Sequence, residues 1–261
     1  MINLKYVDKG NGFDFGKTSE DYAKYRDIYP PSFYKKLVDF GIGLEGQSVL
    51  DLGTGTGVIP RAMVHLGAKF TGADISAEQI AQAKLLSDGM DINYIVRAAD
   101  DTSLPDNSFD AITACQCFWY FDKSTVVPEI YRLLKPGGLF AVLSMIGLPR
   151  ESEILAKSEE LVLKFNPDWN GGDFDRIKLF VPDWLGDMFY VETLHTYVET
   201  LEFTRESWCG RMRACRGVGA SLSPYLVSEY DRDHMAALKK IAGDVLAIPH
   251  QIVMQVFKAR K

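Results

Sequence analysis

The sequence predicts a doubly wound α/β fold, in which a mostly parallel sheet carries helices on both faces and a small helical cap is added to it. Three observations support this prediction. Short apolar runs alternate with amphipathic segments over residues 48–144, which is the pattern of consecutive βαβ units. A glycine-rich turn directly follows the first apolar run, as in many ligand-binding sheets of this kind. The pattern loosens after residue 144 of the 261-residue chain, so the later residues are expected to form the cap.

The glycine-rich turn is the most informative stretch of the chain. A predicted strand at 48–52 runs into Gly53, Gly55 and Gly57, and an amphipathic segment follows at once. Glycines permit a positive φ and let a ligand approach the backbone closely. Their spacing does not fit the dinucleotide fingerprint, and no Gly-Lys-Ser/Thr follows, so a P-loop is excluded. The turn therefore predicts a ligand-binding crevice that is neither a dinucleotide fingerprint nor a P-loop.

Three segments are expected along the chain. Residues 1–45 form an N-terminal helical lid, residues 46–146 a binding core, and residues 147–261 the cap with the last strands of the sheet. The predicted strands are 48–52, 69–73, 93–96, 111–114, 139–144, 191–203 and 251–258, and the predicted helices are 19–26, 32–40, 58–66, 76–88, 124–135, 151–165 and 205–220.

Composition narrows the class of protein. The chain is 47% hydrophobic and has a formal net charge of -6, which is typical of a globular protein and disfavours extended contact with nucleic acid. It has no apolar run of membrane-spanning length and no signal-peptide pattern at its start, so a cytoplasmic protein without a membrane partner is expected. The four cysteines and four histidines show no metal-ligand spacing, and no metal site is expected.

Three motifs in the correct order resemble one enzyme family. Asp51-x-Gly-x-Gly-x-Gly, the segment at 99–110 with Leu-Pro-Asp-x-Ser-Phe-Asp, and Lys-Pro-Gly-Gly at 135–138 resemble the class I, Rossmann-like S-adenosylmethionine-dependent methyltransferases of the type 11 subfamily. The resemblance is specific from about residue 22 to residue 143. It implies S-adenosylmethionine as cofactor and transfer of a methyl group, by in-line displacement, to a small-molecule acceptor. A monomer or a homodimer is expected.

The acid that ends the second predicted strand points to the cofactor. Asp74 stands about 20 residues past the glycines, where a carboxylate can accept hydrogen bonds from both hydroxyls of a ribose. Ser76 and Gln79 form a predicted capping box, which gives Gln79 a structural role as well. The resemblance further implies that Arg26 pairs with the methionyl carboxylate. The complete predicted cofactor set is Arg26, Asp51, Gly53, Thr54, Gly55, Asp74, Ile75, Gln79, Ala99, Asp100, Asp101 and Cys115.

The resemblance places the acceptor after the fourth strand. Gln116, Trp119 and Tyr120 are the predicted acceptor residues there. Many relatives carry His-Trp-Phe where this chain has Trp-Tyr-Phe at 119–121, so the obvious general base is missing and the catalytic residue is left open. His250 is a candidate base, and a packing histidine is the alternative.

Arginines in the last third suggest an anionic acceptor. Arg213 and Arg216 are three residues apart in the predicted helix at 205–220 and would share one face, where they could bind a carboxylate. The alternative is a solvated face paired with Glu202 and Glu206. Two other functions stay open: a non-catalytic S-adenosyl-ligand-binding protein, and a thiol-assisted methyltransferase that acts on a metalloid.

Overall fold

The computed structural model describes residues 2–26 and 28–261 of the chain and divides into two compact units. The sheet unit contains Tyr29–Met145, Lys178–Tyr197 and Ile252–Lys261. The helical unit contains Met1–Ile28, Ile146–Ile177 and Val198–Gln251. This division differs from the three predicted segments, because residues 29–45, 178–197 and 252–261 belong with the core of the sheet unit.

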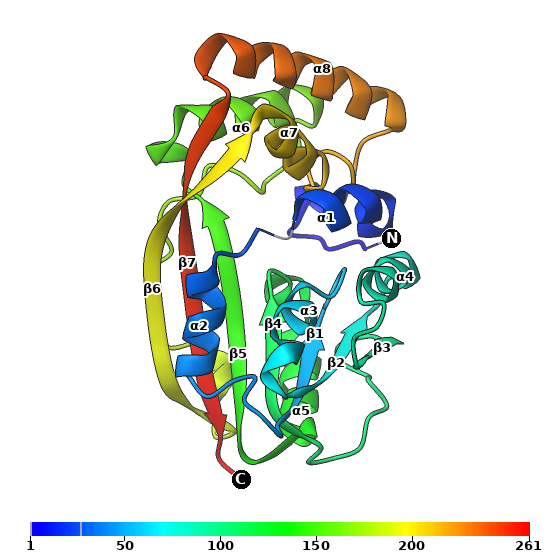
Figure 1. Ribbon diagram of the computed structural model, residues 1–261, viewed down its shortest axis with the longest axis vertical. Helices are drawn as coiled ribbons and strands as arrows, with labels where there is room; N and C mark the ends of the chain where they lie inside the picture. Colours follow the sequence, from blue (N-terminus) through cyan, green and yellow to red (C-terminus); the bar gives the residue numbers. More distant parts are fainter. Residues whose placement is uncertain (1, 27) are drawn as a thin grey trace. The chain divides into compact units, whose positions relative to one another are not determined.

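A sheet of seven strands runs through the described part of the chain. The strands are β1 (Ser48–Leu52), β2 (Lys69–Asp74), β3 (Ile92–Val96), β4 (Phe109–Cys115), β5 (Leu134–Gly147), β6 (Phe189–Thr204) and β7 (Val245–Ala259). Their order is β3-β2-β1-β4-β5-β7-β6. The pairs among β1 to β5 are parallel, and β7 runs against β5 and β6 (Figure 1). The prediction of a mostly parallel, doubly wound sheet is confirmed.

The sheet unit has one helix before β1 and further helices that connect its parallel strands. In the sheet unit they are α2 (Pro31–Asp39), α3 (Val58–Met63), α4 (Ala77–Leu86) and α5 (Lys123–Leu133), with short 3₁₀ turns at η3 (Val64–Leu66), η4 (Phe118–Tyr120) and η6 (Asp183–Leu185). In the sheet, β2 and β3, which follow α3 and α4, lie on one side of β1. β4 and β5, which α5 connects, lie on the other side. Right-handed crossovers therefore place α5 on the opposite face of the sheet.

The apolar runs of the sequence form the core of the sheet unit. Leu50 and Leu52 of β1, Ile112 of β4 and Phe140 of β5 are all fully buried in one cluster. Side chains of α5 complete it, with Ile130 among those that have no exposed area. A central strand buried on both faces explains why β1 reads as a continuous apolar run rather than an alternating one.

The helical unit has its own buried core. Its elements are η1 (Asp8–Gly10), η2 (Phe15–Thr18), α1 (Ser19–Tyr25), η5 (Pro149–Glu151), α6 (Glu153–Phe165), α7 (Arg205–Arg213) and α8 (Pro224–Ile241). Trp208 and Tyr230 are fully buried there. Ser158 lies between them, and its hydroxyl accepts from Trp208 Nε1 at 2.9 Å and lies 2.8 Å from His234 Nε2. A buried polar chain therefore ties α6 to α7 and α8.

Several predicted boundaries were wrong, and one helix was missed. The helix predicted at 205–220 ends at Arg213 and continues as turns, in which the N–H of Gly219 donates to Arg213 O. β5 starts at Leu134, because Leu134 pairs with Phe109 and a bulge takes up the residues before Leu139. α8 has no counterpart among the predicted elements. Within the described residues, no helix is both long and apolar enough to cross a membrane.

Candidate active site

The glycine turn after β1 has left-handed backbone at each of its three glycines. Gly53, Gly55 and Gly57 have φ values of 62°, 56° and 76°. A Cβ added to Gly57 would lie 2.1 Å from the hydroxyl oxygen of Tyr94, and one added to Gly53 would lie 2.7 Å from Cys117 Sγ. These glycines are therefore required by the surrounding chain as well as by the turn itself.

Asp74 fastens this turn to the end of β2. Its carboxylate accepts hydrogen bonds from the backbone N–H groups of Gly55 and Ser76, each at 2.9 Å. Burial raises the pKa of Asp74, and these bonds oppose the shift. The predicted capping box is only half formed: Ser76 Oγ accepts from the N–H of Gln79 at 3.2 Å, but the N–H of Ser76 goes to Asp74. The neighbouring Ile75 is 65% exposed.

A second carboxylate lies beneath the turn. Asp51 is buried in β1 and accepts a hydrogen bond of 2.6 Å from the hydroxyl of Thr113 on β4. Burial raises its pKa to about 6, although the bond from Thr113 lowers it. Thr54, also buried, donates its N–H to Ala73 O at 3.0 Å. The site thus contains two acids at the carboxyl ends of adjacent strands.

The loop after β3 carries three of the predicted cofactor residues. Ala99 packs against the apolar core of the sheet unit. Asp100 and Asp101 are exposed; Asp100 accepts from the hydroxyl of Thr125 at 3.2 Å, and Asp101 from that of Ser103 at 3.3 Å. Both acids therefore keep acceptor positions for a ligand.

Tyr29 belongs to the same edge of the sheet. Cys115 Sγ, at the end of β4, lies 3.3 Å from the hydroxyl oxygen of Tyr29. The ring of Tyr29 packs on Phe33 of α2, with 4.6 Å between ring centres. Since 86 residues separate Tyr29 from Cys115, no local pattern could have revealed the contact.

Gln116 holds a conformation that is unusual for a residue with a side chain. Its φ is 60°, in the left-handed region, where strain is common at functional sites. Its N–H donates to Leu143 O at 2.9 Å, and its side-chain Nε2 donates to the carbonyl oxygen of Met145. The turn after β4 is therefore fastened to β5 by one residue.

The predicted acceptor residues follow in the η4 turn. Phe118 is buried, whereas Trp119 is 41% exposed. The rings of Trp119 and Tyr120 meet edge to face, with 5.7 Å between their centres. The turn that follows β4 thus carries two aromatic rings, a few residues beyond Cys115.

The comparisons with known proteins agree on this architecture. The family model of the methyltransferase domain matches residues 50–142. A ubiquinone biosynthesis O-methyltransferase of Pseudomonas entomophila is 32% identical to the chain over 171 residues, which cover 64% of this chain and 71% of the relative.

The chain belongs to the class I S-adenosylmethionine-dependent methyltransferases.

Solved structures place this methyltransferase in the same fold. A Bacillus halodurans protein provisionally described as a methyltransferase has a TM-score of 0.54 at 19% identity, with 87% of this chain and 98% of that chain covered. An Anaeromyxobacter dehalogenans protein provisionally described as a type II methyltransferase has a TM-score of 0.55 at 19% identity, covering 88% and 96% of the two chains. At this identity the likeness shows the fold alone.

The residues around the glycine turn fit the cofactor of the family. An ionised carboxylate offers about four lone-pair positions. Two of those on Asp74 are used by Gly55 and Ser76, which leaves acceptors for a ribose diol. The buried carboxylate of Asp51 suits the positively charged end of S-adenosylmethionine. The exposed Ile75 offers an apolar surface beside Asp74.

Arg26 and Arg213 lie in the helical unit. The guanidinium of Arg26 lies 5.1 Å from the ring centre of Tyr22, and its predicted contact with the cofactor stays a prediction. Arg213 forms ion pairs with Asp21 at 2.9 Å and Asp231 at 2.7 Å, and both acids raise its pKa. Its charge is therefore already balanced by two carboxylates.

Arg216 is not on the predicted helix face. α7 ends at Arg213, so Arg216 lies in the following turns, where it pairs with the buried Asp8 at 3.1 Å and donates to Asn170 Oδ1 at 2.8 Å. The prediction that Arg213 and Arg216 share one helix face was therefore wrong. Their carboxylate partners are also different from the predicted Glu202 and Glu206.

His250 is a packing residue in this structure. It is fully buried, and its Nδ1 lies 2.9 Å from Ile248 O, so that nitrogen carries the proton. Burial lowers its pKa to about 3. Because an efficient general base needs a pKa nearer the working pH, His250 is not a suitable base.

The cysteines are placed as packing residues too. Cys117 donates to Leu52 O at 3.1 Å, and burial raises the pKa of its thiol well above the ordinary value. Burial also raises the pKa of Cys209 to about 12. No group of three or more potential metal ligands occurs in residues 2–26 and 28–261. This arrangement favours neutral thiols over reactive thiolates.

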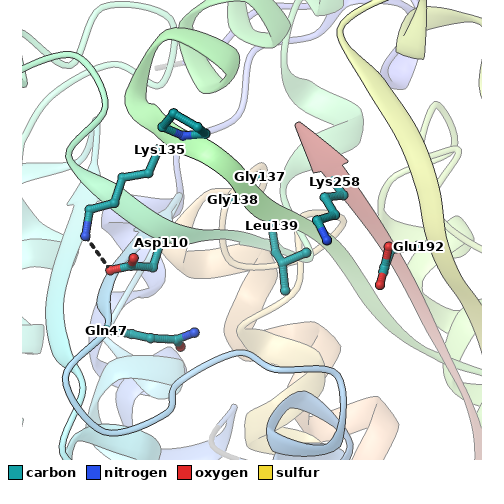
Figure 2. Close-up of a pocket in the computed structure, with 9 residues that line it drawn as sticks. Gln47, Asp110, Lys135, Gly137, Gly138, Leu139, Glu192 and Lys258 are labelled. Carbon is teal, nitrogen blue, oxygen red and sulfur yellow. Dashed lines mark hydrogen bonds and ion pairs between the residues drawn. The ribbon is translucent and has the colours of Figure 1, made fainter. Parts of the chain in front are cut away.

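A polar pocket lies at the other end of the strands (Figure 2). Its volume is about 280 Å³, and Asp110, Lys135, Glu192 and Lys258 line it. Lys135 pairs with Asp110 at 2.7 Å. Asp110 stands near the start of β4 and Cys115 at its end, so this pocket is separate from the glycine turn. It is not part of the candidate active site.

Proposed function

We propose that this methyltransferase transfers a methyl group from S-adenosylmethionine to a hydroxyl group on a small aromatic acceptor. The observation that carries the proposal is the carboxylate of Asp74, which is held against the glycine turn by Gly55 and Ser76 and keeps free acceptor positions. The name of the Pseudomonas relative, a ubiquinone biosynthesis O-methyltransferase, supports oxygen as the accepting atom.

The cofactor is proposed to lie along the carboxyl ends of β1 to β4. Asp74 would bind the ribose, Gly53, Thr54 and Gly55 the methionyl end, and Asp51 the positive charge. The apolar Ile75, together with the loop at 99–101, would enclose the adenine. Of the remaining predicted contacts, Cys115 would be indirect, because it bonds to Tyr29, and Gln79 and Arg26 stay predictions.

The acceptor is proposed to pack on Trp119 and Tyr120. Aromatic rings favour offset or edge-to-face packing on other flat rings, and the exposed Trp119 provides such a surface. Arg213 and Arg216 are left out of the acceptor site, since each is already ion-paired. The negative charge that they predicted for the acceptor is therefore not part of this proposal.

S-adenosylmethionine supplies a methyl group that is already electrophilic, because a positively charged sulfur carries it. The chain then has to orient the acceptor and exclude water. A phenolic hydroxyl has a pKa near 10, so a fraction of the acceptor ionises without a strong base. This agrees with the lack of a suitable histidine among the described residues of the site.

Binding and turnover test the proposal separately. Calorimetric titration with S-adenosylmethionine should show 1:1 binding. The protein should then methylate 3,4-dihydroxybenzoate, and should not methylate benzoate, which lacks the hydroxyl groups. Binding without methylation of any hydroxylated aromatic compound in a panel, charged or neutral, would rule out the proposed acceptor class. Absence of binding would rule out the cofactor assignment.

A further inference from the structure

Lys123 occupies an unusual position for a lysine. It is the first residue of α5, yet its ammonium group points back along the chain. Nζ donates to Phe118 O at 2.5 Å and to Phe121 O at 2.7 Å. It also lies 4.6 Å from the ring centre of Phe118. One cation thus bonds both ends of the turn that carries Trp119 and Tyr120.

The rest of the turn is equally well anchored. Phe118 packs on Phe140 and Trp184, with 5.3 and 5.2 Å between ring centres. Asp122 caps α5 by accepting from the N–H of Ser124 at 2.9 Å. Together with the bond from Gln116 to Met145 O, these contacts leave Trp119 as the exposed ring of a fixed segment.

We propose that Lys123 is a positioning residue for acceptor recognition, acting through the turn at 118–121. The proposal rests on the proposed function, because it assumes that Trp119 and Tyr120 bind the acceptor. Charge-assisted hydrogen bonds are about twice as strong as neutral ones, and two of them converge on this short turn. Without them Phe118 O still accepts from the N–H of Phe121 at 3.2 Å, but both carbonyls lose their charged donor and the turn can take other conformations.

Three variants distinguish a positioning role of Lys123 from a general effect on the stability of the protein. Lys123→Met keeps an apolar stem against Phe118 but removes the donors. Lys123→Arg keeps donors that can reach both carbonyls. Lys84→Met, on the exposed surface of α4, is the control for loss of a lysine. Each is measured with S-adenosylmethionine and with 3,4-dihydroxybenzoate as acceptor.

Loss of the Lys123 ammonium should impair turnover of the acceptor and leave binding of the cofactor unchanged. Lys123→Met should lower kcat/KM for 3,4-dihydroxybenzoate by about tenfold or more, since misplacement by about 1 Å can cost a hundredfold. Its Kd for S-adenosylmethionine should stay within about twofold, because the hydrogen bonds of Lys123 go to the turn and not to Asp74 or the glycines. Lys123→Arg should recover most of the loss, and Lys84→Met should behave as wild type.

Trp119 itself reports the position of the turn. The difference in acrylamide quenching between a protein and its Trp119→Phe counterpart isolates this ring from the other tryptophans. Quenching of Trp119 should differ from that of the wild type in Lys123→Met and should match the wild type in Lys123→Arg. Unchanged quenching would overturn the proposal, and so would changed quenching with an unaltered kcat/KM. If the wild type does not methylate 3,4-dihydroxybenzoate, the proposed acceptor is wrong, and the quenching alone decides whether Lys123 positions the turn.

Discussion

Oδ2 of Asp74 lies 2.9 Å from the backbone nitrogen of Gly55. The acid that ends β2 is thereby bonded to the glycine turn that follows β1. Because the other carboxylate oxygen accepts from Ser76, the same side chain also orders the start of α4. Asp74 therefore shapes the site before any ligand enters it.

Replacement of Asp74 should weaken cofactor binding strongly. Asp74→Ala removes the proposed acceptors of the ribose hydroxyls, and a hydrogen bond to a charged group is worth roughly 1.5–3 kcal/mol. We expect the Kd for S-adenosylmethionine to rise by about tenfold to a hundredfold, measured by calorimetry. Asp88→Ala, at an exposed position of the same unit, is the matched control. Equal affinities of the Asp74 and Asp88 variants would remove Asp74 from the ribose site.

Asp51 should reduce the stability of the unliganded protein at neutral pH. Its pKa is raised to about 6 from 3.8, so the folded chain holds this proton more tightly than the unfolded chain. The contribution to stability is present below about pH 4 and is lost as the pH rises through about 6, for a total of about 3 kcal/mol. Asp51→Asn should therefore unfold at higher urea concentration at pH 7 and bind S-adenosylmethionine less tightly. A variant less stable than wild type at pH 7 would contradict this account.

The buried histidines should give the opposite pH dependence. The pKa of His234 is lowered to about 4 and that of His250 to about 3, each from 6.5, mainly by burial. The unfolded chain then binds two more protons than the folded chain just below pH 6, so stability should fall on acidification from about pH 6.5. His234→Gln, which can still donate to Ser158, should make the urea midpoint less dependent on pH over this range. An identical pH profile in wild type and variant would show that His234 does not contribute.

Ser158 should be a sensitive position in the helical unit. Its hydroxyl lies 2.8 Å from Ile154 O, to which it donates, and it can then accept from both Trp208 and His234. Ser158→Ala leaves two buried donors without an acceptor, at about 1–3 kcal/mol each. We expect a loss of about 2–4 kcal/mol in the free energy of unfolding. Ser228→Ala, exposed on α8, should change it by less than about 0.5 kcal/mol.

Gly57 and Gly46 allow backbone strain to be separated from steric overlap. Both have positive φ, 76° and 81°, but a Cβ on Gly57 would meet the hydroxyl of Tyr94, whereas nothing lies within 4 Å of one on Gly46. Gly46→Ala should cost only the left-handed strain of about 1–2 kcal/mol. Gly57→Ala should cost clearly more, and Tyr94→Phe should reduce that extra cost in a double-mutant cycle. Equal losses for both alanine variants would show that the turn relaxes away from Tyr94.

The strands around the site could be predicted closely from the sequence. β1 has the predicted bounds, and β2 to β4 differ from theirs by at most two residues at either end. Buried parallel strands leave a strong local signal, because their apolar runs are bounded by glycine and acid. The first motif contains Asp51, and Asp74 was predicted from its position about 20 residues past the glycines.

Contacts between distant residues were not predictable in the same way. Tyr29 reaches Cys115, and Arg216 reaches Asp8, and no periodicity connects such pairs. The missed helix α8 did have a signal, since Ser223 and Pro224 form a cap and first-turn pair. The bonds from Lys123 to two carbonyls depend on the shape of the η4 turn, which composition does not encode.

Each unit is assembled from three separate stretches of chain. During synthesis, the N-terminal residues must therefore wait for Val198–Gln251 before their unit is complete, and the sheet unit must wait for the final residues. Such high contact order slows folding and prolongs the exposure of apolar strands. No single cut in the sequence would release either unit whole, so an isolated unit for biophysical work would need its three stretches joined by new linkers.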